Sequence, residues 1–376
     1  MKMHDKATRE PLFRVVKRDT MPVWKSMLIR VIAVLIGILV CAVLSIAVLD
    51  NVDFMKFIKT LFSGAVGTER TIWKLAKNTA VLLCISLAVT PAFRMRFWNI
   101  GAEGQTLIGA LASVAVAYYL GGKIPEPLLL AVMLLAAVLV GAVWGALPAI
   151  FKARWNTNET LFTLMMNYIV IGIVRWLQGG PWEGRQGSQV IPQFDAAACL
   201  PRIFGVHCGW IIVLILVVLM HIYMRYTKHG YEIAVIGDSI NTARYAGMNV
   251  GRIMMRTMFI SGAISGLVGF IVASGANNTL YDGVANGVGF TAITVAWLSQ
   301  LNAFAMVVIS AMLAVLTKGA ETLQTRLAVP TSISEIITGI LLFSMLGCEF
   351  FINFRLILRA KKQRKQEEKA EKEAVK

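Results

Sequence analysis

The segment RYTKHGYEIAVIGDSINTARYAGMNVGRIMMR, residues 225–256, is the only sizeable polar stretch of the chain with long apolar runs on both sides. The run before it covers Trp210–Arg225 and the run after it covers Thr257–Ser274. A helix of about 20 apolar residues crosses a hydrocarbon core of roughly 30 Å. The sequence therefore predicts a polar loop that two membrane-spanning helices hold at one face of a bilayer.

Composition extends this prediction to the whole chain. The 376 residues are 57% hydrophobic and only 15% charged, with a mean hydropathy of +0.67, which is far from the average soluble domain. The predicted fold class is all-α, a polytopic transmembrane helical bundle of about ten spans. These spans are Met27–Leu49, Leu75–Phe93, Ile100–Leu120, Leu128–Phe151, Leu161–Leu177, Trp210–Arg225, Thr257–Ser274, Gly289–Leu301, Ala303–Thr317 and Ser332–Phe351. The eighth and ninth are short and are joined by Ser299–Asn302.

The positive charge of the chain follows this topology. The formal net charge is +16, with 37 Lys and Arg residues, and an arrangement with the N-terminus inside puts most of these residues on one side of the bilayer. Loops rich in Lys and Arg stay in the cytoplasm. Both termini and the segment 225–256 are therefore expected inside the cell. The lipid bilayer accounts for the basic surplus, and nucleic acid is not an expected partner.

These assignments divide the chain into three parts. Residues 1–26 are expected to form a basic, amphipathic segment on the cytoplasmic surface of the membrane, and 355–376 a charged cytoplasmic tail. Residues 27–354 form the transmembrane domain, with a cytoplasmic loop at 226–256 and a main extracytoplasmic loop at 178–209.

Two glycine pairs predict close helix packing. Gly141 with Gly145, and Gly262 with Gly266, have the small-xxx-small spacing that lets helices approach closely inside a membrane.

Three smaller features of the sequence carry local expectations. Asp50–Trp73 reads as an outside loop, and Pro91 is expected to bend or end the second span. Cys199 and Cys208 lie in the large outside loop, where a disulfide is permitted but not required. No Cys or His spacing typical of a metal site occurs.

A short helix is predicted inside the polar segment. Asp238 or Ser239 is a natural N-cap and Gly247 a natural residue just after a helix end, so Ser239–Ala246 is expected to be helical. Ile240, Ala243 and Gly247 fall on one face, with Arg244 and Tyr245 beside them. This pattern indicates a docking helix for a partner protein. The alternative is a solvated loop with one helical turn.

The stretch FWNIGAEGQTLIG (97–109) brings a carboxylate, Glu103, and an amide, Gln105, to the start of an apolar run. Ionisable groups inside spans usually mark function, so Glu103 is a candidate for a structural or solute-path carboxylate. The alternative is that it caps a helix or pairs with Arg94 or Arg96 at the membrane interface. The glycine-rich stretch 275–290 introduces the eighth span from the opposite side, a hint of inverted repeats.

Thr160, Thr163 and Asn167 make one polar stripe on an otherwise apolar helix, at positions i, i+3 and i+7. Exposure of such a polar stripe to lipid costs free energy. Either it lines a path for a solute, or its hydroxyls bond back to their own helix and Asn167 bridges to a neighbouring helix.

The sequence also excludes classes of function. No nucleophile–base pair or metal cluster indicates an enzyme, so no catalytic residue is assigned. No phosphate-binding G-x-x-x-x-G-K-[ST] motif occurs, and the acidic and histidine chain of a proton relay is missing from the spans. A channel-like chain with a protruding docking helix indicates a transport subunit driven by a separate ATPase, without a cofactor of its own.

Three motifs carry a family resemblance: FWNIGAEGQTLIGA (97–110), NETLFTLMMNYIVIGIVRWLQGGPW (158–182) and GYEIAVIGDSINTARYAGMNVGRI (230–253). The chain resembles the inner-membrane permease subunits of bacterial ABC importers, in the branch that serves ribose, branched-chain amino acids and nucleosides, and the nucleoside permeases match best. The family pattern R-A-V-G is changed here, because Glu232 and Ile233 precede Ala234 and Ile236 precedes Gly237. Because of that change, the sequence does not predict which residues form salt bridges in this segment.

The resemblance implies a multi-pass protein of the bacterial cytoplasmic membrane with a type II importer-like fold. It implies a permease homodimer or heterodimer, ATP-binding subunits that hold ATP and Mg on the cytoplasmic face, and an extracytoplasmic substrate-binding lipoprotein. The coupling helix would consist of Asp238, Ser239, Ala243, Arg244, Tyr245 and Gly247. The expected function is nucleoside import, with Glu103, Gln105, Thr160, Thr163 and Asn167 along the solute path. The alternatives are a permease for a simple sugar such as ribose or galactose, and a transporter or channel that works alone.

Overall fold

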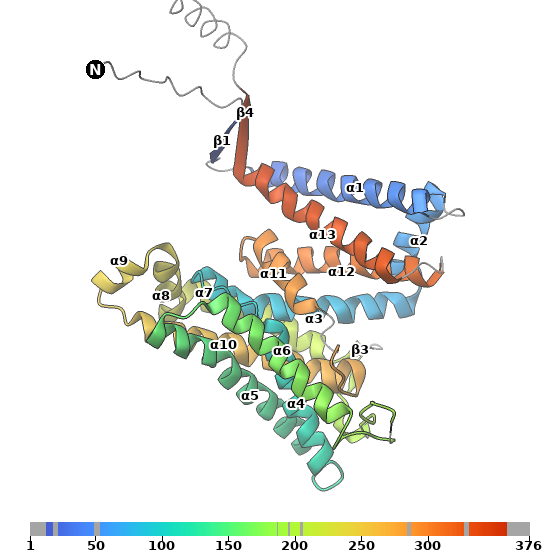
Figure 1. The fold of residues 1–376 in the computed structure, drawn as a ribbon, viewed down its shortest axis with the longest axis vertical. Coiled ribbons are helices and arrows are strands. Elements are labelled where there is room, and N and C mark those ends of the chain that lie inside the picture. The colour runs from blue at the N-terminus through green and yellow to red at the C-terminus, as the bar shows by residue number, and fades with distance from the viewer. Residues whose placement is uncertain are drawn as a thin grey trace, which may run out of the picture. The chain divides into compact units, whose positions relative to one another are not determined.

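The structure is a computed structural model that describes residues 13–17, 22–48, 53–185, 187–194, 196–203, 206–283, 287–326 and 331–358. The described chain is almost entirely helical and separates into two compact units, Met1–Phe54 with Glu335–Lys376, and Met55–Ser334. Figure 1 shows the elements of both units.

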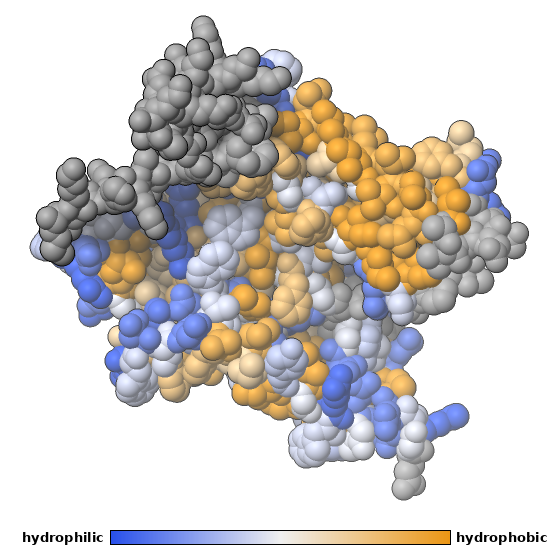
Figure 2. All heavy atoms as spheres, turned by 45° about the horizontal axis from the view of Figure 1, so that its top comes forward, coloured by the Kyte–Doolittle hydropathy of each residue, from blue (hydrophilic) through white to orange (hydrophobic). Residues whose placement is uncertain are grey.

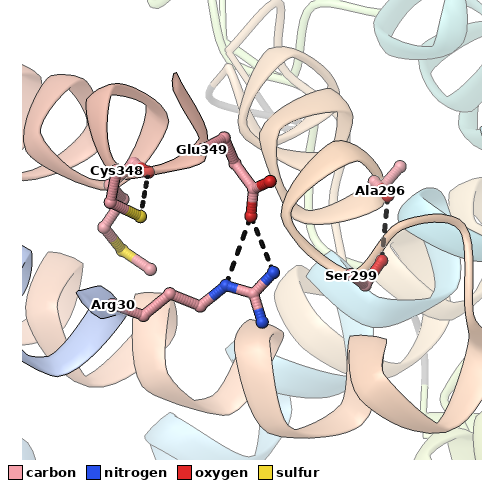
Figure 3. A network of polar contacts seen from close by, with 6 residues as sticks. Arg30, Ala296, Ser299, Cys348 and Glu349 are labelled. Atoms are coloured by element: carbon pink, nitrogen blue, oxygen red, sulfur yellow. Dashed lines mark hydrogen bonds and ion pairs between the residues drawn. The ribbon is translucent and has the colours of Figure 1, made fainter. Parts of the chain in front are cut away.

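The smaller unit pairs the two ends of the chain. It contains α1 (Val23–Val48) and most of α13 (Thr331–Asn353), and the strands β1 (Phe13–Lys17) and β4 (Phe354–Leu358) run antiparallel beside each other. Within it, Arg30 Nε and Nη2 donate to Glu349 Oε1 at 3.2 and 2.7 Å (Figure 3). This ion pair joins two helices of membrane length. Pairing lowers the free-energy cost of charged side chains inside a membrane span.

Much of the expected N-terminal segment and charged tail lies outside the described residues. Of the segment 1–26, Phe13–Lys17 forms β1, and its membrane-surface role stays a prediction. The strand β4 crosses the boundary expected at residue 355.

The larger unit holds the other helices in chain order. They are α2 (Phe54–Val66), α3 (Glu69–Arg94), α4 (Ala102–Leu120), α5 (Glu126–Trp155), α6 (Glu159–Gln178), α7 (Gly209–Tyr226), α8 (Lys228–Asp238), α9 (Ile240–Tyr245), α10 (Val250–Phe270), α11 (Val288–Leu298) and α12 (Ala303–Arg326). A π-helix (Ile271–Asn277) continues α10, and the outer loop adds a 3₁₀ turn (Ala196–Ala198) and the two-residue strands β2 (Arg202–Ile203) and β3 (Val206–His207).

Within the described residues, 8 helices are long and apolar enough to cross a membrane, namely α1, α3, α5, α6, α7, α10, α12 and α13. The other two predicted spans correspond to α4, which begins with polar residues, and α11, which has 11 residues. An 11-residue helix is about 16 Å long, about half of a hydrocarbon core. The polytopic helical class is confirmed, and the number of crossings stays a prediction.

The helix bounds correct two local expectations, and a bend at Pro91 stays a prediction. Most of the outside loop expected at Asp50–Trp73 is helical, because Phe57 and Leu61 give α2 a buried face at helical spacing and α3 already begins at Glu69. Pro91 does not end its helix, since α3 continues to Arg94 and the carbonyl of Pro91 accepts a bond from Met95 N at 3.2 Å.

The core of the larger unit is a close crossing of α5 and α10. A Cβ added to Gly262 would lie 2.3 Å from the carbonyl oxygen of Gly141, and one added to Gly145 would lie 2.7 Å from Gly262 Cα. Small residues let backbones approach in this way inside membranes. The predicted tight packing of these glycines is therefore confirmed, and the two backbones are in direct contact.

Large hydrophobic side chains stay exposed on the outer faces of the helices, as a chain surrounded by lipid requires. They include Leu35, Leu39 and Val43 of α1, and Leu135 and Leu139 of α5. Figure 2 shows how much of one face of the molecule is hydrophobic.

We expect Gly262→Ala to destabilise the protein, because overpacking of a tight contact costs about 1–3 kcal/mol. The matched control is Gly172→Ala on α6, where an added Cβ meets nothing within 4 Å. Thermal unfolding of the purified protein in detergent should show a lower midpoint for the first variant and an unchanged or higher midpoint for the second. Equal midpoints would contradict the packing argument.

Candidate functional site

The predicted short helix is present at one end of the larger unit. Ser239 caps α9 by accepting a bond from Thr242 N at 3.3 Å, and Gly247 follows the helix with φ +75°. Ala243 is fully buried beneath it, while Arg244 is exposed and Tyr245 is 93% exposed. Asp238 ends α8 and is exposed. The result is a small capped helix with a polar, aromatic outer face, and Figure 1 shows it at the edge of the unit.

A helix that the sequence reading missed, α8, fixes the position of α9. Thr227 caps α8, and its buried residues Ile233 and Ile236 pack in one hydrophobic cluster with Met95 and Phe97. Gly237 allows the closest approach, since a Cβ there would lie 2.0 Å from the carbonyl oxygen of Arg94. The apolar spacing of Ile233 and Ile236 could have revealed this helix. The docking helix is thus anchored to the chain that connects α3 to α4.

A cavity of about 530 Å³ opens between α9 and this connection. Arg96, Lys152 and Arg244 contribute positive charge to its wall, and Asp238 and Glu159 contribute negative charge. Lys152 Nζ lies 2.9 Å from Glu159 Oε2. The guanidinium groups of Arg96 and Arg244 are exposed, so the cavity presents a net positive surface to whatever docks on α9.

His229 ties the base of the docking segment to its neighbours. Its ring nitrogens lie against the hydroxyls of Tyr223 on α7 and Thr257 on α10. Burial lowers the pKa of His229 below its usual range, Arg256 lowers it further, and Glu232 opposes the change. The neutral imidazole therefore acts as a hydrogen-bonded link between three helices.

A second polar region surrounds the residues Met95–Gly101, which we call the connector. Asn99 is fully buried and exchanges hydrogen bonds with Gln105, its Nδ2 donating at 3.3 Å and its Oδ1 accepting at 3.2 Å. Asn99 Nδ2 also lies 3.3 Å from Ser261 Oγ, near the midpoint of α10. The connector therefore reaches the middle of a membrane-length helix before α4 begins, and Gln105 belongs to this buried network.

The polar stripe of α6 faces the connector. Thr163 Oγ1 bonds back to the carbonyls of Glu159 and Thr160 and accepts from Ile100 N at 3.2 Å. Asn167 Oδ1 accepts from Gly104 N at 2.9 Å, and its Nδ2 donates to the Ile100 carbonyl at 3.0 Å. These are the bonds of the second alternative, in which Asn167 bridges to a neighbour. Thr160 is half-buried at the start of the stripe. The solute-path role of Thr160, Thr163 and Asn167 stays a prediction.

Glu103 is buried and bonds to the start of α11. Its Oε1 accepts from Gly287 N at 2.8 Å and its Oε2 accepts from Gly289 N at 2.6 Å. Its recorded partners are thus backbone N–H groups at the start of α11, which fits the alternative in which Glu103 caps a helix, and not a pairing with Arg94 or Arg96. The carboxylate lies in the first turn of α4 and at the N-terminus of α11, where both helix dipoles favour a negative charge.

This contact joins the two glycine-rich stretches that the sequence indicated as possible inverted repeats. The N-termini of α4 and α11 meet, and α11, with 11 residues, is too short to span a membrane. The non-helical connector before α4 is irregular backbone of the kind that membranes tolerate where it is buried in protein or lines a water-filled cavity. The far end of α11 carries Trp297, which stacks on Trp98 with ring centroids 5.6 Å apart. The sequence analysis did not single out Trp98 and Asn99, which lie in the quoted motif 97–110, or Trp297, which lies in the predicted eighth span.

Cys199 and Cys208, in the loop between α6 and α7, form no disulfide. Arg175 Nε pairs with Asp282 Oδ2 at 2.7 Å and ties α6 to the segment before α11. No group of three or more His, Cys, Asp or Glu residues in the described ranges could hold a metal ion.

Helices of membrane length and a capped, exposed helix at one end of the larger unit define a polytopic membrane protein. Residues 71–346 match the family described as "Branched-chain amino acid transport system / permease component", and the chain belongs to this family of multi-pass plasma-membrane permeases of ABC transporters.

Three relatives illustrate the range of the family. The glucose ABC transporter permease protein TsgB13 of Haloferax volcanii is 30% identical over 90% of this chain and 92% of its own. The guanosine ABC transporter permease protein NupP of Bacillus subtilis is 28% identical over 84% of this chain and 92% of its own. The nucleoside ABC transporter permease protein NupB of Lactococcus lactis subsp. cremoris is 25% identical over 88% and 93%, respectively. The predicted family is confirmed, near the nucleoside permeases.

We expect Asn167→Leu to lower both stability and transport, because it leaves Gly104 N–H and the Ile100 carbonyl without a partner at about 1–3 kcal/mol each. The matched control is Met165→Leu, which changes an exposed hydrophobic side chain of the same helix outside the polar stripe. Thermal unfolding and solute uptake in membrane vesicles measure the two effects. A fully active, equally stable Asn167→Leu variant would show that the connector does not need this bridge.

Proposed function

We propose that this chain is the membrane subunit of an ABC importer for a nucleoside, and that separate ATP-binding subunits drive it. The observation that carries this proposal is α9, an exposed, capped helix whose buried side is fixed to the connector. A helix of six residues cannot fold alone, so its rigid presentation on the larger unit is suited to contact with another protein. The chain has no ATP-binding motif of its own, and ATP and Mg would be held by the partner subunits.

The contact with the ATP-binding subunits would use Asp238, Ser239, Ala243, Arg244, Tyr245 and Gly247. Ser239 and Gly247 define the ends of α9, Ala243 seats it, and Arg244 and Tyr245 supply the exposed contact groups. The positive cavity wall beside them suits an acidic segment of the partner. Under this proposal the α8–α9 end would lie in the cytoplasm, the side that the distribution of Lys and Arg favours.

The remaining assembly follows the architecture expected of a type II importer. Two permease subunits, identical or different, would enclose the solute path between them, and a substrate-binding lipoprotein would deliver the solute on the outer side. Alternating access would result when closure of the ATP-binding subunits moves α9.

The solute path would run beside the polar residues Glu103, Gln105, Thr160, Thr163 and Asn167. The side chains of Glu103, Gln105, Thr163 and Asn167 form hydrogen bonds within the chain, so these residues would shape the path and leave few free charges in it. Such a path suits a neutral polar solute. The names of NupP and NupB favour a nucleoside.

A simple sugar is the second candidate, and one observation favours it: TsgB13 is named a glucose permease. A transporter that works alone is less consistent with relatives that are all named subunits of ABC transporters.

Uptake by the complete transporter, reconstituted with its ATP-binding subunits and binding protein, decides between the solutes. We expect ATP-dependent uptake of labelled guanosine that excess unlabelled nucleoside suppresses and excess glucose does not. Suppression by glucose or ribose alone would assign the protein to sugars. Flux through the permease without any ATP-binding subunit would contradict the ABC mechanism.

Reversal of charge on the docking helix tests the coupling role. We expect Arg244→Glu to abolish ATP-driven uptake and to weaken binding of the ATP-binding subunits, because a like charge would then face the partner. The control is Arg154→Glu, which reverses an exposed charge at the end of α5 outside the cavity and α9. Co-purification and uptake are measured together, and normal values for both in Arg244→Glu would remove Arg244 from the contact.

A further inference from the structure

The broken helix α11 is attached at both ends to the same stretch of chain, Phe93–Glu103. At its N-terminus, Glu103 accepts bonds from Gly287 N and Gly289 N. At its C-terminus, Trp297 stacks on Trp98 and lies 5.8 Å from the ring of Phe93. These contacts bind α11 to the connector and to the first turn of α4.

The same connector is bound to the docking segment. Met95 and Phe97 share a hydrophobic cluster with Ile236, and the backbones of Arg94 and Gly237 touch. A continuous series of packed groups therefore runs from α9 through α8 and the connector to α11. Packed groups transmit displacement because protein interiors are dense and scarcely compressible.

The turns at both ends of α11 contain left-handed backbone. Gly287 has φ +72° at the start, and Gln300 and Leu301 have φ +52° and +60° just after the end. A few residues at the ends of an element commonly absorb the backbone rotation of a hinge. α11 is thus a short helix that packs against α3, α4 and α12, with left-handed backbone at both of its ends.

We propose that Glu103 is a positioning residue that fastens α11 to α4, so that movement of the docking helix reaches α11 in the interior of the protein. The inference rests on the proposed function and adds the part that transmits the movement. Glu103 is suited to this role because each of its two oxygens accepts from a different N–H of α11. Glutamine has one acceptor oxygen at this position and turns an NH₂ group toward the second donor. It loses one bond and gains a repulsive contact.

The test compares Glu103→Gln with Glu126→Gln in the complete transporter. Glu126 is an exposed carboxylate in the first turn of α5 and is the matched control. We expect Glu103→Gln to assemble with the ATP-binding subunits and to hydrolyse ATP, while solute carried per ATP falls by at least about tenfold, the effect of one lost charge-assisted hydrogen bond. Glu103→Asp, shorter by one methylene, should keep one bond and show an intermediate loss.

A purely structural role would lower assembly, ATP hydrolysis and uptake together. An unchanged ratio of solute to ATP in Glu103→Gln overturns the proposal. If Glu103→Gln does not reach the membrane, the ratio of solute to ATP is measured for Glu103→Asp instead, and an unchanged ratio in that variant overturns the proposal.

A second variant breaks the same contact from the opposite side. A Cβ at residue 289 would lie 2.6 Å from Glu103 Oε2 and 2.7 Å from its backbone N, so Gly289→Ala must move α11 away from α4. We expect the double variant Glu103→Gln with Gly289→Ala to lose no more coupling than the worse single variant, because both remove one contact. Additive losses overturn the proposal.

Failure of this inference and failure of the proposed function give different results. If the wild-type permease neither binds ATP-binding subunits nor carries a solute with ATP, the proposed function fails. If the wild type does both and the Glu103 and Gly289 variants match it in solute per ATP, only the role of Glu103 fails.

Discussion

The structure depends on one constraint: backbone polar groups that lie inside a membrane protein must find partners within that protein. The connector and the start of α11 break helical pairing among membrane-length helices. Asn167 bonds to Gly104 and Ile100, Thr163 bonds to Ile100, and Glu103 bonds to Gly287 and Gly289. These side chains replace the missing helical bonds. The polar residues of the spans are therefore explained first as the partners of a broken backbone.

The glycine contacts make the same arrangement possible in three dimensions. Gly262 and Gly141 bring α10 and α5 into backbone contact, and Gly109 brings α4 within the same distance of Gly266. Helices this close exclude lipid from the region where the backbone is irregular. Gly289 serves the same purpose on α11, since any side chain there would collide with Glu103. Close helix packing and the polar network together allow the irregular backbone to lie inside the protein.

The sequence predicted the features that depend on local pattern. Apolar length predicted the helical class, Ser239 and Gly247 predicted both ends of α9, and the glycine pairs predicted tight packing. Prediction from the sequence failed for the features that depend on tertiary contacts. Nothing local to Glu103 shows that its partner is Gly289, 186 residues away, and the amphipathic spacing of α2 lay in a stretch short enough to read as a loop. Arg30 and Glu349 were each visible in a predicted span, but their pairing required the fold.

The position of Glu103 also bears on how a weakly charged path can exist beside a buried carboxylate. The bonds from two N–H groups and the dipoles of α4 and α11 offset part of the field of this carboxylate. On the proposed solute path, a neutral polar solute would therefore meet only a weak counter-ion, whereas a charged amino acid would need a strong one. If the proposed path is correct, the same bonds that connect Glu103 to α11 also favour a neutral solute over a charged one, so the proposed mechanical role and the proposed solute preference would have a single physical origin.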